Sequence, residues 1–222
     1  MGEIFVLVEH RQGKVRDITY EMLQAGETLA SQQGVSSTAV LLGHNVKNFA
    51  EELAAKASKV LVVEDVQLEH FNSILYQKVL SSLITKYQPP LTLMGHSAFG
   101  MDLAPSLSVE IGFPLVTDCI GLSFEGSRLK AVRSIYGGKV NANVSVRESK
   151  GYIATVRPGV FSPGAPGEKK GGIVMKLSPL QGTIDVKKFI EYIESPITGE
   201  DITQAEIIVS VGQGIGGPEY IP

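Results

Sequence analysis

Two hydrophobic periodicities alternate along the first half of the chain, and this alternation restricts the fold more than any other feature of the sequence. Short apolar runs typical of buried strands are separated by stretches in which apolar side chains recur every three or four residues, as on one face of a helix. The pattern predicts strands at 4–8, 38–42, 60–63 and 91–94, and helices at 19–33, 46–57, 71–87 and 101–111. Mostly apolar strands that alternate with helices indicate a parallel sheet covered on both faces.

The pattern changes after Pro114, where short strands follow one another with no helix between them. Turn signals separate four expected strands at 119–124, 129–136, 140–146 and 152–156. We expect these strands to pair antiparallel, as an edge extension of the main sheet or as a small second sheet. The predicted fold class is therefore α/β, a three-layer, mainly parallel sheet with helices on both faces and an antiparallel strand extension. Such a fold is Rossmann-like and adenine-nucleotide-hydrolase-like.

The last third of the chain carries weaker signals. Residues 162–172, SPGAPGEKKGG, have the composition of a loop or linker. One more strand is expected at 173–177, a short helix at 186–193 and a final strand at 206–211, before a glycine-rich end.

Composition argues against several classes of function. The net charge is −3 and the Lys and Arg residues are scattered, so no basic patch for nucleic acid is seen and nothing favours an anionic membrane surface. No apolar stretch approaches the roughly 18 residues of a membrane span, and the N-terminus lacks a signal-peptide core. Cys119 is the single cysteine and lies in the apolar run 115–122, which indicates a buried structural thiol. The cytoplasm is the expected compartment.

A glycine motif stands near the end of the chain. Gly212, Gly214 and Gly217 have the G-x-G-x-x-G spacing and directly follow the apolar run IIVSV. Glycines in this position let the backbone approach a pyrophosphate, whose charge then rests on the N-terminus of the next helix. Only five residues follow, two of them proline, so the pattern alone favours a flexible tail over a nucleotide site.

The loop 95–100, GHSAFG, is a second candidate site, because it follows a strand and precedes a helix. Ligands of open α/β sheets bind outside the carboxyl ends of the strands, and Ser97 with its neighbouring amides could hold an anionic group there. The alternative, which we favour, is a helix start at which Ser97 or Asp102 caps free amides.

Three histidines, His10, His44 and His96, each follow an expected strand, whereas His70 lies elsewhere. The three could gather at one end of the sheet, but none has metal-ligand spacing, so strand-end polar residues are the favoured interpretation. The loop 10–14 lacks a glycine fingerprint and is expected to be a surface turn. No catalytic residues and no metal ligands are predicted.

Four sequence blocks, taken together, resemble the alpha subunits of electron-transfer flavoproteins. The first, 97–122, has a small-residue loop, a Gly, an Asp-Leu-x-Pro helix start and a Val-Thr-Asp run in the family's order. The stretches RSIYGGKVNANVSV and YIATVRPGVF are similar to the next two blocks, and DITQAEIIVSVGQGIGGPE is similar to the start of the family's flavin-binding domain.

The resemblance implies an N-terminal α/β domain without flavin at 1–195, followed at 196–222 by a linker and the truncated start of an FAD-binding domain. It implies that Gly212, Gln213 and Gly214 contact FAD only in a full-length context, and that this chain alone binds none. Where Gln213 stands the family usually has an arginine, so the hydrogen-bonding capacity is kept and the charge is lost. The implied partners are a beta subunit and dehydrogenases such as acyl-CoA dehydrogenase, which makes the chain part of an electron carrier and not an enzyme.

Two other functions are compatible with the sequence. One is a nucleotide-binding module that resembles universal-stress-type α/β domains and uses the loop 95–100 as its phosphate cradle. The other is an interaction protein without a small ligand, in which the strands after Pro114 form a self-associating edge.

Overall fold

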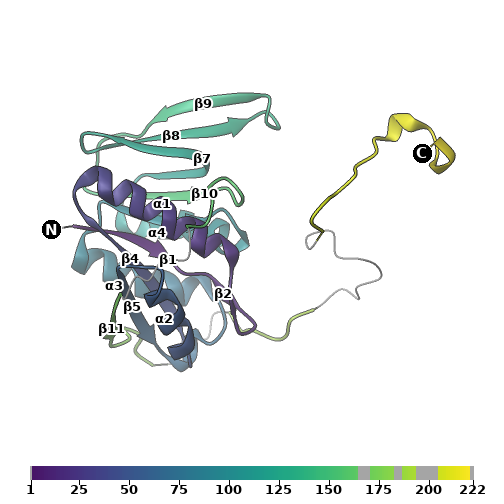
Figure 1. Cartoon of the computed structure of the whole chain (residues 1–222). Helices are drawn as coiled ribbons and strands as arrows, with labels where there is room; N and C mark the ends of the chain where they lie inside the picture. Colours follow the sequence, from purple (N-terminus) through teal and green to yellow (C-terminus); the bar gives the residue numbers. More distant parts are fainter. Residues whose placement is uncertain (1, 165–170, 183–186, 194–204, 221–222) are drawn as a thin grey trace. The chain divides into compact units, whose positions relative to one another are not determined.

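The computed structural model describes residues 2–164, 171–182, 187–193 and 205–220. The chain divides into two compact units, 1–189 and 190–222. The first unit holds a sheet with the strand order β11-β5-β4-β1-β6-β10-β7-β8-β9 (Figure 1). Its strands are β1 (Glu3–Leu7), β4 (Ser36–Gly43), β5 (Lys59–Glu64), β6 (Leu91–Gly95), β7 (Leu115–Glu125), β8 (Arg128–Ile135), β9 (Val140–Ser145), β10 (Tyr152–Val156) and β11 (Gly172–Lys176).

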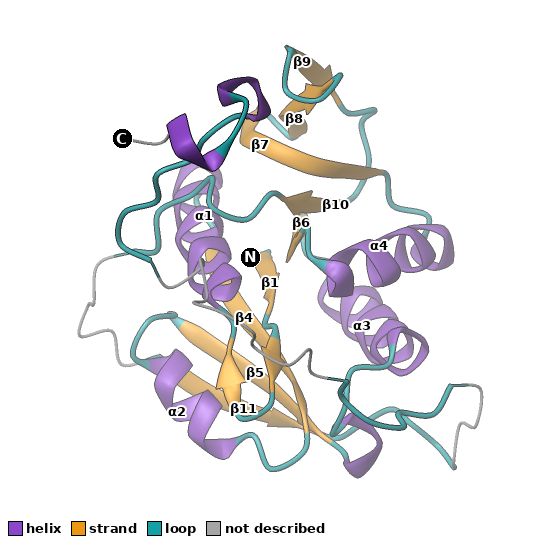
Figure 2. Ribbon diagram, turned by 90° about the vertical axis from the view of Figure 1, so that its right-hand side faces the viewer, coloured by secondary structure: helices purple, strands orange, loops and turns teal. Residues whose placement is uncertain are grey.

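Helices cover both faces of the parallel part of this sheet. They are α1 (Asp17–Gln33), α2 (Lys47–Ala54), α3 (Ser73–Tyr87) and α4 (Ala98–Ile111). Figure 2 shows α1 and α2 on one side of the strands and α3 and α4 on the other. Side chains of a strand point alternately to the two faces, so on β1 Ile4 and Val6 join the core under α1 and α2, whereas Phe5 and Leu7 join the core under α3 and α4. The predicted three-layer fold is confirmed.

The strand expected at 152–156 differs from the prediction in its direction. Strand β10 lies between β6 and β7 and runs parallel to both, with Ile153 opposite Thr92 of β6 and Leu115 of β7. The antiparallel pairs of this sheet are β7 with β8 and β8 with β9. All five residues of β10 are buried, which is the burial of a central parallel strand and not of an edge extension.

The strand expected at 173–177 is confirmed as β11, which lies at one edge of the sheet and pairs parallel with β5. A helix was expected at 186–193. The described residues 187–193 do not form one, and residue 186 lies outside the described part of the chain. Instead the Lys187 carbonyl accepts a hydrogen bond from Asn72 (3.0 Å), and the Phe189 ring stacks on His70 at 3.8 Å. Of the expected linker 162–172, residues 165–170 lie outside the described ones, and Gly172 already begins β11.

In the second unit, the strand expected at 206–211 does not form. A strand satisfies its backbone N–H and C=O groups only by pairing with another, and no described segment pairs with this one. Ile207 and Val209 are accordingly exposed. Two short 3₁₀ turns, Gln213–Ile215 and Pro218–Tyr220, are the regular structure in the described part of this unit.

Candidate functional site

Strands β7, β8 and β9 present two rows of side chains on their outer face. One row is Gly121, Val132 and Asn143, and the next is Ser123, Lys130 and Ser145, as the antiparallel registers require. The row between them, Leu122, Ala131 and Val144, points to the opposite face, where it contacts the core on the side of α1 and α2. The outer face is therefore made of small and polar side chains around one valine.

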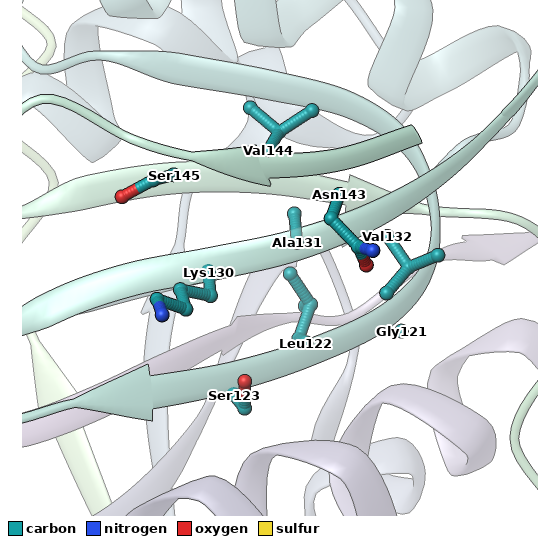
Figure 3. Close-up of a pocket in the computed structure, with 9 residues that line it drawn as sticks. All are labelled: Gly121, Leu122, Ser123, Lys130, Ala131, Val132, Asn143, Val144 and Ser145. Carbon is teal, nitrogen blue, oxygen red and sulfur yellow. The ribbon is translucent and has the colours of Figure 1, made fainter. Parts of the chain in front are cut away.

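This outer face holds a hollow of about 560 Å³ (Figure 3). The residues that line it are Gly121, Leu122, Ser123, Lys130, Ala131, Val132, Asn143, Val144 and Ser145. Lys130 is the one charged residue of the lining, and its Nζ pairs with Glu125 Oε2 at 2.7 Å. None of the helices α1–α4 of the first unit lies over β8 and β9 (Figure 1). Small, polar and aliphatic side chains line the hollow, so it offers a contact surface.

At the carboxyl end of the parallel strands, Asp118 and Arg157 form an ion pair with two hydrogen bonds. Arg157 Nε donates to Oδ1 at 2.9 Å and Nη2 donates to Oδ2 at 2.7 Å. The Arg157 guanidinium is the largest cause that holds the pKa of Asp118 below its usual range. Thr155 connects this pair to His96, since its Oγ1 accepts from the Asp118 N–H (3.1 Å) and lies 2.9 Å from His96 Nδ1.

The position where the strand order reverses, between β1 and β6, is where open α/β sheets usually take a ligand. Here Glu9 fills it. Its side chain is 4% exposed, Oε2 accepts from the Ser97 hydroxyl at 2.8 Å, and Oε1 is buried against Gly95 without a hydrogen-bond partner among the described residues. Ser97 also caps α4, because its Oγ accepts from the N–H groups of Phe99 and Gly100.

The capping interpretation of the loop 95–100 is thus the one the structure supports. The two amides that an anion would use are engaged by Ser97, and a carboxylate lies beside them. Asp102 is not a cap: it lies within α4, where its Oδ2 is 3.4 Å from Lys187 Nζ.

We expect Glu9→Gln to stabilise the chain at pH 7 by about 1–3 kcal/mol, because the Ser97 hydrogen bond only partly offsets the cost of burying a carboxylate whose other oxygen has no hydrogen-bond partner among the described residues. Burial raises the pKa of Glu9 above its ordinary value of 4.5, against the Ser97 hydrogen bond and the Arg16 charge. The folded chain therefore binds this proton more tightly than the unfolded chain, and stability falls as the pH rises from 4.5 through the raised pKa. Glutamine still accepts from Ser97 and has no charge.

The measurement for Glu9→Gln is the free energy of unfolding by urea between pH 4 and pH 8, values that bracket the ordinary carboxyl range. Glu51→Gln is the matched control, because the Glu51 side chain is 59% exposed. If the free energy of unfolding changes with pH in the same way for Glu9→Gln and for the unmodified chain, the pKa of Glu9 is not raised by burial.

The histidines do not gather into a metal site. His10 Nε2 is 2.7 Å from the Leu42 carbonyl at the end of β4, and its ring contacts Phe49, whereas His96 contacts Thr155 in β10. Among the described residues no group of three or more His, Cys, Asp or Glu is arranged to hold a metal ion.

The turn expected at 10–14 is confirmed as a hairpin of β2 (His10–Arg11) and β3 (Lys14–Val15). Its two turn residues, Gln12 and Gly13, both have positive φ (49° and 77°), as a two-residue I′ turn requires.

Cys119 is buried, as predicted, and burial raises the pKa of its thiol to about 12. A thiol with this pKa stays protonated near neutrality, so it is not a nucleophile.

The glycine-rich end was the predicted FAD contact. Space is open around Gly212 and Gly214, and the backbone of 213–215 makes a 3₁₀ turn. Among the described residues, the 3₁₀ turn Pro218–Tyr220 follows Gly217, and no α-helix does. The assignment of Gly212, Gln213 and Gly214 to FAD stays a prediction.

Sequence reasoning missed the two features that organise the carboxyl edge, Glu9 and the Asp118–Arg157 pair. A charged residue inside the apolar run 115–122 is a signal that something must neutralise Asp118. The partner comes from the end of another strand, 39 positions away, and no local pattern identifies it.

Among the described residues, no helix is long and apolar enough to cross a membrane.

A family model described as electron transfer flavoprotein domain matches residues 4–179. The chain is 32% identical over 220 residues to the electron transfer flavoprotein subunit alpha of Thermoanaerobacterium thermosaccharolyticum, a match that covers 98% of this chain and 67% of that protein.

Two further relatives show the same extent of similarity. Identity is 33% over 220 residues to the electron transfer flavoprotein subunit alpha of Megasphaera elsdenii, covering 97% of this chain and 65% of that protein. The chain is 31% identical over 218 residues to lactate dehydrogenase (NAD(+),ferredoxin) subunit LctC of Acetobacterium woodii, a match that covers 96% of this chain and 51% of that protein. The chain therefore spans about two thirds or less of the length of these curated relatives.

Proposed function

The chain belongs to the electron transfer flavoprotein family, where it matches alpha subunits over nearly its whole length, and we propose that it is the scaffold and partner-docking part of an electron carrier. The carrier takes electrons from dehydrogenases, such as acyl-CoA dehydrogenase, and passes them to a downstream acceptor through FAD. Its direct partner is the beta subunit. Residues 1–195 are the docking domain, and 196–222 are a linker and the start of the FAD-binding domain.

The observation that carries this proposal is the outer face of β7–β9, which none of the helices α1–α4 covers. Protein interfaces are depleted of charged side chains at their centre and keep them at the rim. The two rows at the middle of this face contain one charged residue, Lys130, whereas Glu125 and Arg128 form the next row of the same face, where Glu125 pairs with Lys130. The hollow gives the face a shape that side chains of another protein can fill. These features suit a protein partner better than a small anionic ligand.

FAD supplies the redox chemistry of such carriers when it is bound. The described residues of this chain do not fit the dinucleotide by themselves. A pyrophosphate cradle needs a strand, a glycine turn and a helix in succession, and the described residues 205–220 form neither the strand nor the helix. We therefore propose that FAD is held mainly by residues that correspond to the remaining third of the relatives.

The glycines 212 and 214, together with Gln213, then complete that site only in a full-length context. The cytoplasm is the proposed compartment, since a single cysteine gives the chain no internal disulfide that would favour an oxidising one.

The proposal is tested by gel filtration of the chain alone and after coexpression with the beta subunit, with protein and flavin absorbance recorded together. We expect the chain to co-elute with the beta subunit, and the chain alone to elute without flavin absorbance. Circular dichroism of each protein shows whether it is folded. Separate elution of two folded proteins contradicts the docking role, and a yellow chain in the absence of its partner contradicts the placement of FAD.

A further inference from the structure

Strand β7 changes partners along its length, and its backbone is irregular where the change occurs. Its first residues pair parallel with β10, whereas its later residues pair antiparallel with β8. Between Val116 and Cys119 the strand has one residue more than β10, and between Cys119 and Gly121 one more than β8. Extra residues of this kind bend a strand and increase its twist.

Asp118 stands in the first of these irregular stretches with φ of +54°. This left-handed conformation is uncommon for residues other than glycine and persists where the surroundings hold it. The contacts that hold it come from the end of the neighbouring strand β10 and the residue that follows it. Thr155 of β10 is fully buried and binds the Asp118 N–H, while Arg157 takes both carboxylate oxygens.

The backbone on either side of Asp118 is fixed as well. The Arg157 N–H donates to the Cys119 carbonyl at 3.0 Å, and the His96 N–H donates to the Val156 carbonyl at 2.6 Å. The bend in β7 is thus tied to β10, and β10 is tied to the start of α4. Every residue of the outer face described above lies beyond this bend.

We infer that the Asp118–Arg157 pair is a positioning device, which sets the angle at which β7–β9 leave the parallel sheet and so aims the docking face at the beta subunit. This inference rests on the proposed function. The pair lies partly in solvent, with side-chain exposures of 24% for Asp118 and 40% for Arg157. A pair this exposed adds little to global stability, so its effect is on local geometry.

The first test measures that geometry directly in the chain without its partner. Spin labels are placed at Asn141→Cys in β9 and Lys47→Cys in α2, two exposed positions, and the distance between them is measured by pulsed electron paramagnetic resonance. Arg157→Ala is expected to shift or broaden the distance distribution. This substitution removes the guanidinium and keeps aspartate at position 118. A distribution equal to that of unmodified Arg157 overturns the inference, whether or not the beta subunit binds.

The second test is the affinity for the beta subunit, measured by calorimetry. Arg157→Ala is expected to weaken it about tenfold or more. Asp118→Asn, which keeps the tolerance for positive φ, is expected to weaken it similarly, and Arg157→Lys, which keeps the charge but not the two-point contact, to weaken it less.

The matched control is Lys59→Ala, because it removes a pair of similar exposure, Lys59–Glu3 at 2.7 Å, which joins β5 to β1 and lies apart from β7–β9 in the strand order. An equal loss of affinity for Arg157→Ala and Lys59→Ala overturns the inference. If the unmodified chain itself fails to bind the beta subunit, the proposed function fails, and the label distances alone decide on the role of the pair.

Discussion

Gly100→Ala is expected to destabilise the chain by about 3 kcal/mol or more, because the added methyl group overpacks the contact between α4 and β6. A Cβ at position 100 would overlap the carbonyl oxygen of Gly95 and come within 3.1 Å of its carbonyl carbon. Both obstructing atoms belong to the backbone of β6, so no side chain can rotate away. Either α4 moves off the sheet or β6 distorts, and the Ser97 cap and Glu9 contact are strained in both cases.

The measurement is the midpoint and slope of urea unfolding followed by circular dichroism. Gly172→Ala is the matched control, because no heavy atom lies within 4 Å of a Cβ built there and its φ is not in the left-handed range. That variant is expected to stay within about 0.5 kcal/mol of the unmodified chain. Equal midpoints for the two variants contradict the close approach of α4 to β6.

Val132→Glu is expected to weaken binding of the beta subunit more than a hundredfold while the chain stays folded. Val132 lies in the middle of the outer face, between Gly121 and Asn143, and its side chain points away from the core. A carboxylate there remains hydrated in the free chain but becomes buried without a partner in the complex, which costs about 3–5 kcal/mol.

The affinity is measured by calorimetry, and circular dichroism checks the fold of the variant. Val66→Glu provides the control, since Val66 is 64% exposed in a short 3₁₀ turn far along the sheet order from β8. If both variants bind the beta subunit equally well, the outer face of β7–β9 is not the docking surface.

Local patterns were sufficient for most of the parallel half of the fold. Strands β1 and β4 contain the continuous apolar runs 4–7 and 39–42, and α3 shows its buried stripe of Leu75, Val79 and Leu83 at helical spacing. These elements are specified by residues close in sequence, so a periodicity finds them.

The errors concern properties that depend on distant residues. The run Tyr152–Val156 was found as a strand, but its direction depends on the gap that β6 and β7 leave open. The residues 206–211 have strand composition, yet a strand is a property of at least two segments. The left-handed backbone of Asp118 depends on Thr155 and Arg157, and the burial of Glu9 depends on Ser97. No local pattern could predict these pairings.

The place of β10 in the sheet also fixes the order in which this protein can assemble as it leaves the ribosome. Strands β1, β4, β5 and β6 can join as soon as each has been synthesised, because each pairs with a strand already made. Strand β7 has no such neighbour, since β10 occupies the position between it and β6. Until residue 156 has been added, the chain therefore connects the hairpins of β7–β9 to the parallel strands only through α4. The edges of β6 and β7 that β10 will join stay unpaired in the nascent chain until then.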